Sequence, residues 1–199
     1  MIIDDIICEI KSNASEDYAK FHRMMIQSES GYGKGDLVMG CRMPDLRKIA
    51  KKYCNGLSMD DLRNLLQSAY HEVRTLALII MVQKFQDEKL RKDIVQMYLA
   101  NTKFVNNWGL VDISAHHIIG KFFGSNDKIF DQLSDSNNLW ENRIAIVATL
   151  FFIKQNDFRL TLRLCEKFLK HPHHLIHKAC GWMLREVGKK DESVLVNFL

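Results

Sequence analysis

Apolar residues recur at helical spacing along almost the whole chain. The first helical pattern is carried by five isoleucines, Ile2, Ile3, Ile6, Ile7 and Ile10. Their i, i+3, i+4 spacing predicts that residues 1–28 form one or two helices, and Ser15 is placed to cap the second. The 199 residues contain only two prolines and ten glycines. So few helix breakers favour long helices over a turn-rich β architecture.

The next helix predicted by this pattern runs from Met43 to Tyr53, with Pro44 in its first turn, where a missing N–H costs little. One face of this helix is apolar, with Leu46, Ile49, Ala50 and Tyr53. The opposite face is basic, with Arg47, Lys48, Lys51 and Lys52. A basic face is consistent with simple solvation or with contacts to phosphates. We take Arg47 and Lys51 as candidate DNA-binding residues.

A glycine-rich stretch, residues 28–36, precedes this helix and predicts a loop. It lacks the GxxxxGK[ST] pattern of a nucleotide-binding phosphate loop. Two interpretations are open: a simple connector, or a loop that brings Lys34 to DNA.

Beyond residue 56 the helical patterns come in pairs with a regular period. Ser58 starts the first pair, with Asp61 at the capping-box position. The second helices of successive pairs start near His71, Asn107, Trp140 and His174, at intervals of 36, 33 and 34 residues. An all-helical period in the mid-thirties is typical of an α-solenoid. We therefore expect an all-α, HEAT-like helical-repeat α-solenoid, residues 1–199, with N-terminal helices and the loop in 1–56 and tandem pairs in 57–199.

In a solenoid, equivalent positions of successive second helices line one concave surface. Arg74, Asp112, Arg143 and Lys178 occupy such positions and would lie in neighbouring rows. We take Arg74 and Lys178 as further candidate DNA-binding residues. Arg143 lies near a helix start, where the macrodipole disfavours a cation. It would either form a salt bridge, to Glu141 or to a neighbouring repeat, or fork onto the oxygens of a phosphate.

Two tryptophans add aromatic surface to these rows. Trp108 stands four residues before Asp112, so on a helix the indole and the carboxylate would share one face. An unpaired buried carboxylate is costly, so this pair calls for a functional explanation. Trp182 is either a core residue or, in the concave row, a platform for a sugar or base. Together, one carboxylate, flat aromatics and cations suit a sugar-like cation formed beside a phosphate chain.

Histidines suggest two further possibilities. His173, His177 and Cys180 have a spacing that zinc ligands on a helix can show. However, no HExxH motif and no second ligand cluster accompany them, so we expect no metal. His116 is expected on the same helix as Asp112, four residues after it, and could pair with that carboxylate.

Charge and cysteine usage indicate the surroundings of the protein. The formal net charge is +4, which is compatible with a polyanionic partner. The five cysteines include no CxxC pair, and their odd number favours a reducing, intracellular (cytoplasmic) location. The N-terminus lacks a basic, signal-like segment. The longest apolar run, Ile144 to Ile153, has about half the length of a membrane span, so we expect no membrane association.

Several motifs in order resemble the DNA alkylation repair family of HEAT-like-repeat DNA glycosylases (the AlkD type). They are Gly40–Lys51, His71–Arg74, Asn107–Asp112, Trp140–Thr149 and Lys178–Lys189. The resemblance runs from about Tyr32 to Lys190. It implies hydrolysis of the N-glycosidic bond of positively charged alkylpurines, such as 7-methylguanine and 3-methyladenine, in duplex DNA. It also implies base excision repair by a monofunctional enzyme without a metal or other cofactor, and we expect a monomer.

The resemblance assigns roles residue by residue. Asp112 matches the catalytic Asp, Trp108 and Trp182 match the DNA-contacting tryptophans, and Arg143 matches the phosphate-side Arg. The family often has a second basic residue beside that Arg, where this chain has Asn142. Because a fold does not guarantee catalysis, two alternatives remain: a non-catalytic module that binds distorted or branched DNA, and a protein-binding scaffold.

Overall fold

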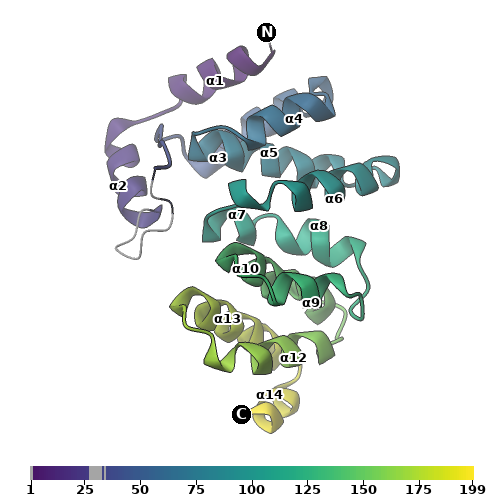
Figure 1. The fold of residues 1–199 in the computed structure, drawn as a ribbon. Coiled ribbons are helices and arrows are strands. Elements are labelled where there is room, and N and C mark those ends of the chain that lie inside the picture. The colour runs from purple at the N-terminus through teal and green to yellow at the C-terminus, as the bar shows by residue number, and fades with distance from the viewer. Residues whose placement is uncertain (1, 27–32, 34) are drawn as a thin grey trace. The chain divides into compact units, whose positions relative to one another are not determined.

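The structure is a computed structural model that describes residues 2–26, 33 and 35–199. Its regular secondary structure in these ranges is helical, and pairing of β type is limited there to two isolated bridges. The all-α helical-repeat class predicted from the sequence is therefore confirmed. The chain divides into two compact units, unit 1 (Met1–Leu110) and unit 2 (Val111–Leu199), shown in Figure 1.

Unit 1 is built around a buried helix, α5. The helices of this unit are α1 (Ile2–Ser12), α2 (Glu16–Ile26), α3 (Met43–Tyr53), α4 (Met59–Leu66), α5 (His71–Lys84) and α6 (Arg91–Ala100), with 3-10 turns η1 (Cys54–Gly56), η2 (Glu88–Leu90) and η3 (Thr102–Phe104). Helix α5 packs against α3 and α4, and α1 lies along α3 (Figure 1). Because ten of its fourteen residues are buried, α5 is covered on several sides and lacks a wide polar face.

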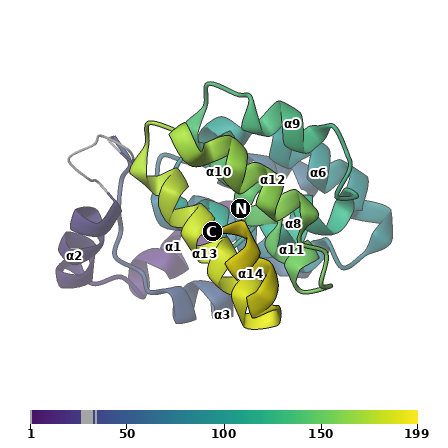
Figure 2. The same ribbon diagram turned by 90° about the horizontal axis from the view of Figure 1, so that it is seen from below.

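Unit 2 is built around α10 in the same way. Its helices are α8 (Ala115–Phe122), α9 (Ile129–Ser134), α10 (Leu139–Ala148), α11 (Leu150–Ile153), α12 (Arg159–Lys167), α13 (His174–Lys190) and α14 (Glu192–Phe198), with the 3-10 turn η4 (Phe168–Lys170). Helix α10 contacts α8, α9 and α13. Seen from below, α14 lies against α13 (Figure 2). The central helix α10 holds Asn142 and Arg143 at buried positions, where each of them needs a partner.

The local signals read from the sequence are largely confirmed. Ser58 caps α4 through a complete capping box with Asp61. The Ser15 hydroxyl accepts a hydrogen bond from the Tyr18 N–H at 3.5 Å. Pro44 lies at the start of α3, whose stripe Leu46, Ile49 and Ala50 is buried. Most of the glycine-rich stretch, with Lys34, lies outside the described residues.

The predicted repeat is also confirmed by the helix starts. The second helices begin at His71, Trp108, Leu139 and His174, each within one residue of its expected position. One expectation was wrong: Asp112 and His116 do not lie on one continuous helix. Helix α7 (Trp108–Asp112) is a single turn that crosses the unit boundary, and a turn at Ile113 and Ser114 separates it from α8.

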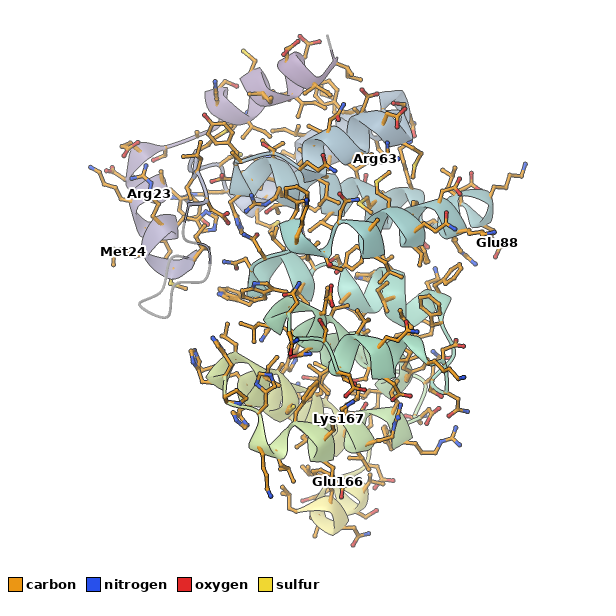
Figure 3. The ribbon with its side chains drawn as sticks, in the orientation of Figure 1. Arg23, Met24, Arg63, Glu88, Glu166 and Lys167 are labelled. Atoms are coloured by element: carbon orange, nitrogen blue, oxygen red, sulfur yellow. The ribbon has the colours of Figure 1, made fainter. Side chains whose placement is uncertain are left out.

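Side-chain contacts tie together the first helices of successive pairs in unit 2. Lys167 of α12, labelled in Figure 3, reaches the end of α9, where its Nζ lies 2.8 Å from the Ser134 Oγ and 2.6 Å from an Asp135 carboxylate oxygen. Arg163 of α12 likewise pairs with Asp131 of α9 at 2.6 Å. Exposed pairs of this kind contribute little to stability.

Within the described part of the chain, no helix is both long enough and apolar enough to cross a membrane.

Candidate active site

The predicted catalytic carboxylate and the predicted phosphate-side arginine are direct partners in unit 2. The Arg143 Nε donates to one Asp112 oxygen at 3.0 Å, and its Nη2 donates to the other at 2.9 Å. This is a bidentate contact, in which the planar guanidinium matches both carboxylate oxygens. The sequence left two partners open for a salt bridge from Arg143. The structure shows a partner in the neighbouring repeat, Asp112, and not Glu141.

A third hydrogen bond fixes the guanidinium from the other side. The Arg143 Nη1 donates to the Leu175 carbonyl in the first turn of α13 at 2.8 Å. Arg143 thus links α7, α10 and α13, and three of its five N–H groups are engaged by these contacts. The carboxylate and the carbonyl offset the unfavourable position of a cation in the N-terminal half of α10.

The two members of the pair differ in exposure. The side chain of Arg143 is only 6% exposed, whereas that of Asp112 is 21% exposed. The arginine is therefore mainly an internal support, and the carboxylate is the group with access to solvent. Burial raises the pKa of Asp112, and the hydrogen bonds and charge of Arg143 act in the opposite direction. The site thus holds a half-buried carboxylate in a fixed orientation.

The other predicted residues of unit 2 lie on α13, the helix that holds Arg143. Trp182 is half-buried and Lys178 is exposed. Four residues separate them, so on this helix they share a face. The indole and the ammonium are thus presented from one face of α13.

His116 does not pair with the Asp112 carboxylate, which was one possibility raised by the sequence. Its contact is with the backbone of Asp112. Burial lowers the pKa of His116 to about 3, and the nearby His117 and Lys154 add to this effect. The imidazole is therefore neutral at physiological pH and carries no charge toward the carboxylate.

The histidines at the start of α13 form a structural cap. The His173 Nδ1 accepts a hydrogen bond from the Leu175 N–H at 3.2 Å. The His171 Nδ1 accepts from the His173 N–H at 3.1 Å, and the His177 Nε2 contacts the His171 carbonyl at 2.7 Å. These contacts order the turn before α13 by satisfying polar groups at its N-terminus. No group of three or more potential metal-binding side chains occurs in the described ranges.

Asn142 was noted in the sequence only as a departure from the family pattern, and the structure gives it a structural role. Its Nδ2 donates to the carbonyls of Leu133 and Ser136, each at 2.9 Å. Its Oδ1 lies 3.1 Å from the His171 Nε2. The side chain therefore fastens the end of α9 and the turn before α13 to α10. A buried amide in an otherwise apolar helix is the signal that could have revealed it.

The predicted residues of unit 1 divide into exposed and buried groups. Arg47 and Lys51 are exposed on α3, as the sequence pattern predicted. Arg74 is instead only 3% exposed, and its guanidinium binds the Asp36 carboxylate and, at 2.9 Å, the Ser68 carbonyl. The structure thus places Arg74 in an internal ion pair and not on an exposed row. Trp108, the first residue of α7, is half-buried.

Two buried carboxylates of unit 1 were missed by the sequence analysis. Asp36 is the last residue of the glycine-rich stretch and pairs with Arg74. Glu72 has no exposed surface and accepts hydrogen bonds from the N–H groups of Met39 and Gly40 at 3.1 and 2.8 Å. Their partners are more than 30 residues away, so no local pattern could have revealed them.

Comparison with known proteins agrees with this architecture. A family model described as DNA alkylation repair enzyme matches residues 6–199. One solved structure, a "predicted DNA alkylation repair enzyme" from Enterococcus faecalis, is similar with a TM-score of 0.71 and 16% identity, over 94% of this chain and 89% of that one. At this identity the likeness bears on the fold. No curated protein matches the sequence. Because the family model covers almost the whole chain, the protein belongs to the DNA alkylation repair enzyme family.

Proposed function

We propose that this protein is a monofunctional DNA glycosylase that hydrolyses the N-glycosidic bond of positively charged alkylpurines in duplex DNA. Membership of the family indicates a role in the repair of alkylation damage. The observation that carries the finer proposal is the half-buried Asp112 carboxylate, held at both oxygens by Arg143. A fixed anion of this kind stabilises positive charge that develops beside it.

The proposed reaction needs little from the protein. An alkylated purine such as 7-methylguanine already carries a positive charge, so the bond from its nitrogen to the sugar C1′ breaks with both electrons going to the base. The sugar becomes an oxocarbenium-like cation, and a water molecule adds to C1′ and loses a proton. In this scheme Asp112 stabilises the sugar cation and orients the water. No metal or other cofactor takes part.

The remaining residues have supporting roles in the proposal. Arg143 fixes the carboxylate, and because its own side chain is only 6% exposed it acts from inside the protein, through Asp112. Trp182 and Lys178 on α13 contact the DNA, the first by stacking and the second through a phosphate. Trp108, Arg47 and Lys51 keep their predicted roles as DNA contacts. The protein is expected to act as an intracellular monomer.

The decisive experiment is release of methylated purines from methylated duplex DNA, with Asp112→Asn beside the wild type. The amide keeps the shape of the side chain but cannot stabilise a cation, so base release should be lost while duplex binding stays near normal. The matched control is Asp131→Asn, because Asp131 is an exposed ion-paired carboxylate on α9 of the same unit. Release by Asp112→Asn at the wild-type rate would overturn the proposal.

Binding data distinguish the alternatives. A non-catalytic DNA-binding module would bind duplex DNA but release no base, even as the wild type. For a protein-binding scaffold, the log of the affinity for duplex DNA would not fall linearly with the log of the salt concentration. A DNA-binding protein shows such a fall, with a slope of about −0.9 for each phosphate contact. Titration of duplex DNA at two salt concentrations therefore tests for DNA binding before any chemistry is measured.

A further inference from the structure

Two buried cysteines on neighbouring helices of unit 2 have no part in the proposed reaction. Cys165 lies on α12 and is 2% exposed, and Cys180 lies on α13 and is 8% exposed. Both are free thiols. Helices α12 and α13 pack against one another, as Figure 2 shows. The two thiols are therefore candidates for chemistry with each other.

A hydrogen bond brings the Cys165 side chain to Cys180. The Cys165 Sγ donates to the Cys180 carbonyl at 3.9 Å. Two cysteines this close on packed helices can form a disulfide, provided that the sulfurs move to the bonding distance of about 2.05 Å. The pair is fifteen residues apart in sequence, so a bond would close a short loop across two helices.

The two thiols are not equivalent. The hydrogen bond from Cys165 and the charge of Arg143 lower the pKa of Cys180, against the effect of burial. The hydrogen bond to Cys180 and burial raise the pKa of Cys165. Cys180 is also the more exposed of the two. The thiol that is more stabilised as its thiolate is the one that an oxidant attacks first.

We propose that Cys165 and Cys180 form a peroxide-sensitive dithiol site, in which oxidation links α12 to α13 by a disulfide. The Cys180 thiolate attacks hydrogen peroxide, which leaves a sulfenic acid and hydroxide. The Cys165 sulfur then attacks the Cys180 sulfur, which forms the S–S bond and releases water. In total, two thiols lose two electrons and two protons, and one peroxide becomes two waters.

The disulfide would be reversible. Thiol–disulfide exchange with a cellular thiol returns both cysteines to the reduced form. In a reducing compartment the dithiol is therefore the resting form, and the disulfide forms under oxidative stress. Because Leu175 and Cys180 share α13, the bond would also fix the helix that holds Arg143.

The test uses the full-length protein, treated with a small excess of hydrogen peroxide and then alkylated with N-ethylmaleimide. Trypsin cleaves after Arg163, Lys167, Lys178 and Arg185, so the two cysteines fall in separate peptides. Before alkylation we expect an intact mass lower by about 2 Da, and after alkylation we expect two fewer N-ethylmaleimide adducts and a crosslinked pair of these peptides. Dithiothreitol should restore the intact mass of the reduced protein and separate the two peptides. The thermal midpoint of the oxidised form should be a few degrees higher, because the bond restricts the unfolded chain.

Two controls make the result specific. Cys41 is buried, and the pKa of its thiol is raised to about 11, so it should stay reduced at the same peroxide dose. In Cys165→Ala, Cys180 should be trapped by dimedone as a sulfenic acid, with no crosslink. Alkylation of both Cys165 and Cys180 after peroxide would overturn the proposal. So would a crosslink of Cys180 to another cysteine, or a crosslink that appears only in denaturant. None of these readouts depends on glycosylase activity.

Discussion

Arg143 binds both carboxylate oxygens of Asp112, at 3.0 and 2.9 Å, and is itself fastened to the Leu175 carbonyl. The arginine is nearly inaccessible, and the acid is partly open to solvent. In the proposed reaction the acid therefore acts on the substrate, and the arginine controls where the acid lies and when it is ionised. Substitution of the arginine separates these two effects.

Arg143→Lys should slow base release about tenfold or more, equivalent to about 1.4 kcal/mol of transition-state stabilisation. Lysine keeps the charge but loses the fork that matches two oxygens and the bond to Leu175. The pH profile should shift as well. Burial raises the pKa of Asp112, and Arg143 opposes this, so a weaker partner lets the pKa rise further. Because Asp112 acts as a carboxylate, activity is kept above its pKa and lost below it, and the acid limb should move to higher pH.

The measurement is single-turnover base release across a pH series, which reports the chemical step without product release. The matched control is Arg163→Lys, which alters an exposed ion pair with Asp131 in the same unit. An unshifted acid limb in Arg143→Lys would mean that Arg143 does not set the protonation of Asp112.

Arg74 and Lys178 were both predicted to contact DNA, and the structure separates them. Arg74→Ala should lower the free energy of unfolding by about 3 kcal/mol, because it removes the cation that is paired with the buried Asp36 carboxylate. Lys178→Ala should change stability by less than about 0.5 kcal/mol, because Lys178 is exposed. It should, however, reduce the slope of log affinity against log salt by about 0.9, the value of one phosphate contact.

Urea unfolding and fluorescence anisotropy with labelled duplex DNA at several salt concentrations give both quantities. The two variants serve as controls for one another. If Arg74→Ala were as stable as the wild type and had the smaller salt slope, Arg74 would be a phosphate ligand and its pairing with Asp36 would be incidental.

The contrast between these two residues shows what the sequence could predict. The helix starts, the Ser58 cap and the apolar stripe of α3 follow from local periodicity and capping chemistry, which depend on neighbours within a few residues. The same periodicity places Arg74 and Lys178 at equivalent positions of two repeats. The periodicity contains no information on Asp36, which lies in a loop 38 residues before Arg74 and forms an ion pair with it.

The candidate site was predicted in its residues but not in its contacts. Asp112, Arg143 and Trp182 were identified, and a salt bridge from Arg143 to a neighbouring repeat was one stated possibility. The bidentate pairing depends on how α7 and α10 pack, which no local pattern determines. The break between α7 and α8 was also missed, because Ile113 and Ser114 include no proline or glycine to mark it.

Gly181 and Gly120 give a further pair of contrasting substitutions in unit 2. Both lie inside helices, where alanine is preferred by up to about 1 kcal/mol. A Cβ added at Gly181 meets nothing within 4 Å, whereas one added at Gly120 would collide with the Ala148 carbonyl oxygen and the Phe151 side chain. Gly181→Ala should therefore stabilise the protein by about 0.5–1 kcal/mol. Gly120→Ala should destabilise it by about 1–3 kcal/mol.

Gly181 also tests the proposed DNA contact, because it is exposed next to Trp182. Glycine lets a ligand approach the backbone closely. If DNA packs against this part of α13, Gly181→Ala should bind duplex DNA more weakly although it is more stable. Thermal unfolding and anisotropy titration measure the two effects separately. Stabilisation with unchanged affinity would place the DNA away from Gly181.

The buried carboxylate of Glu72 should make the stability of the protein depend on pH. Burial raises its pKa, but the contact with His22 and the N–H groups of Gly40 and Met39 outweigh this, so the pKa lies below the usual value of 4.5. A carboxyl with a lowered pKa in the folded state stabilises the protein above its unfolded pKa. This contribution is lost as the pH falls from about 4.5 through the folded pKa. Wild-type stability should therefore decline steeply in that range.

Glu72→Gln should remove much of this dependence. The amide keeps one acceptor oxygen but turns an NH₂ group toward a backbone N–H, so the free energy of unfolding at pH 7 should fall by about 2 kcal/mol. Its decline at acid pH should be shallower than that of the wild type, since one titrating group is absent. Glu9→Gln is the control, because Glu9 is a more exposed carboxylate of unit 1 whose pKa is lowered by Lys52 and Tyr53. Urea unfolding followed by circular dichroism between pH 7 and pH 3.5 gives the curves, and a Glu72→Gln curve parallel to the wild type would show that other groups govern the acid response.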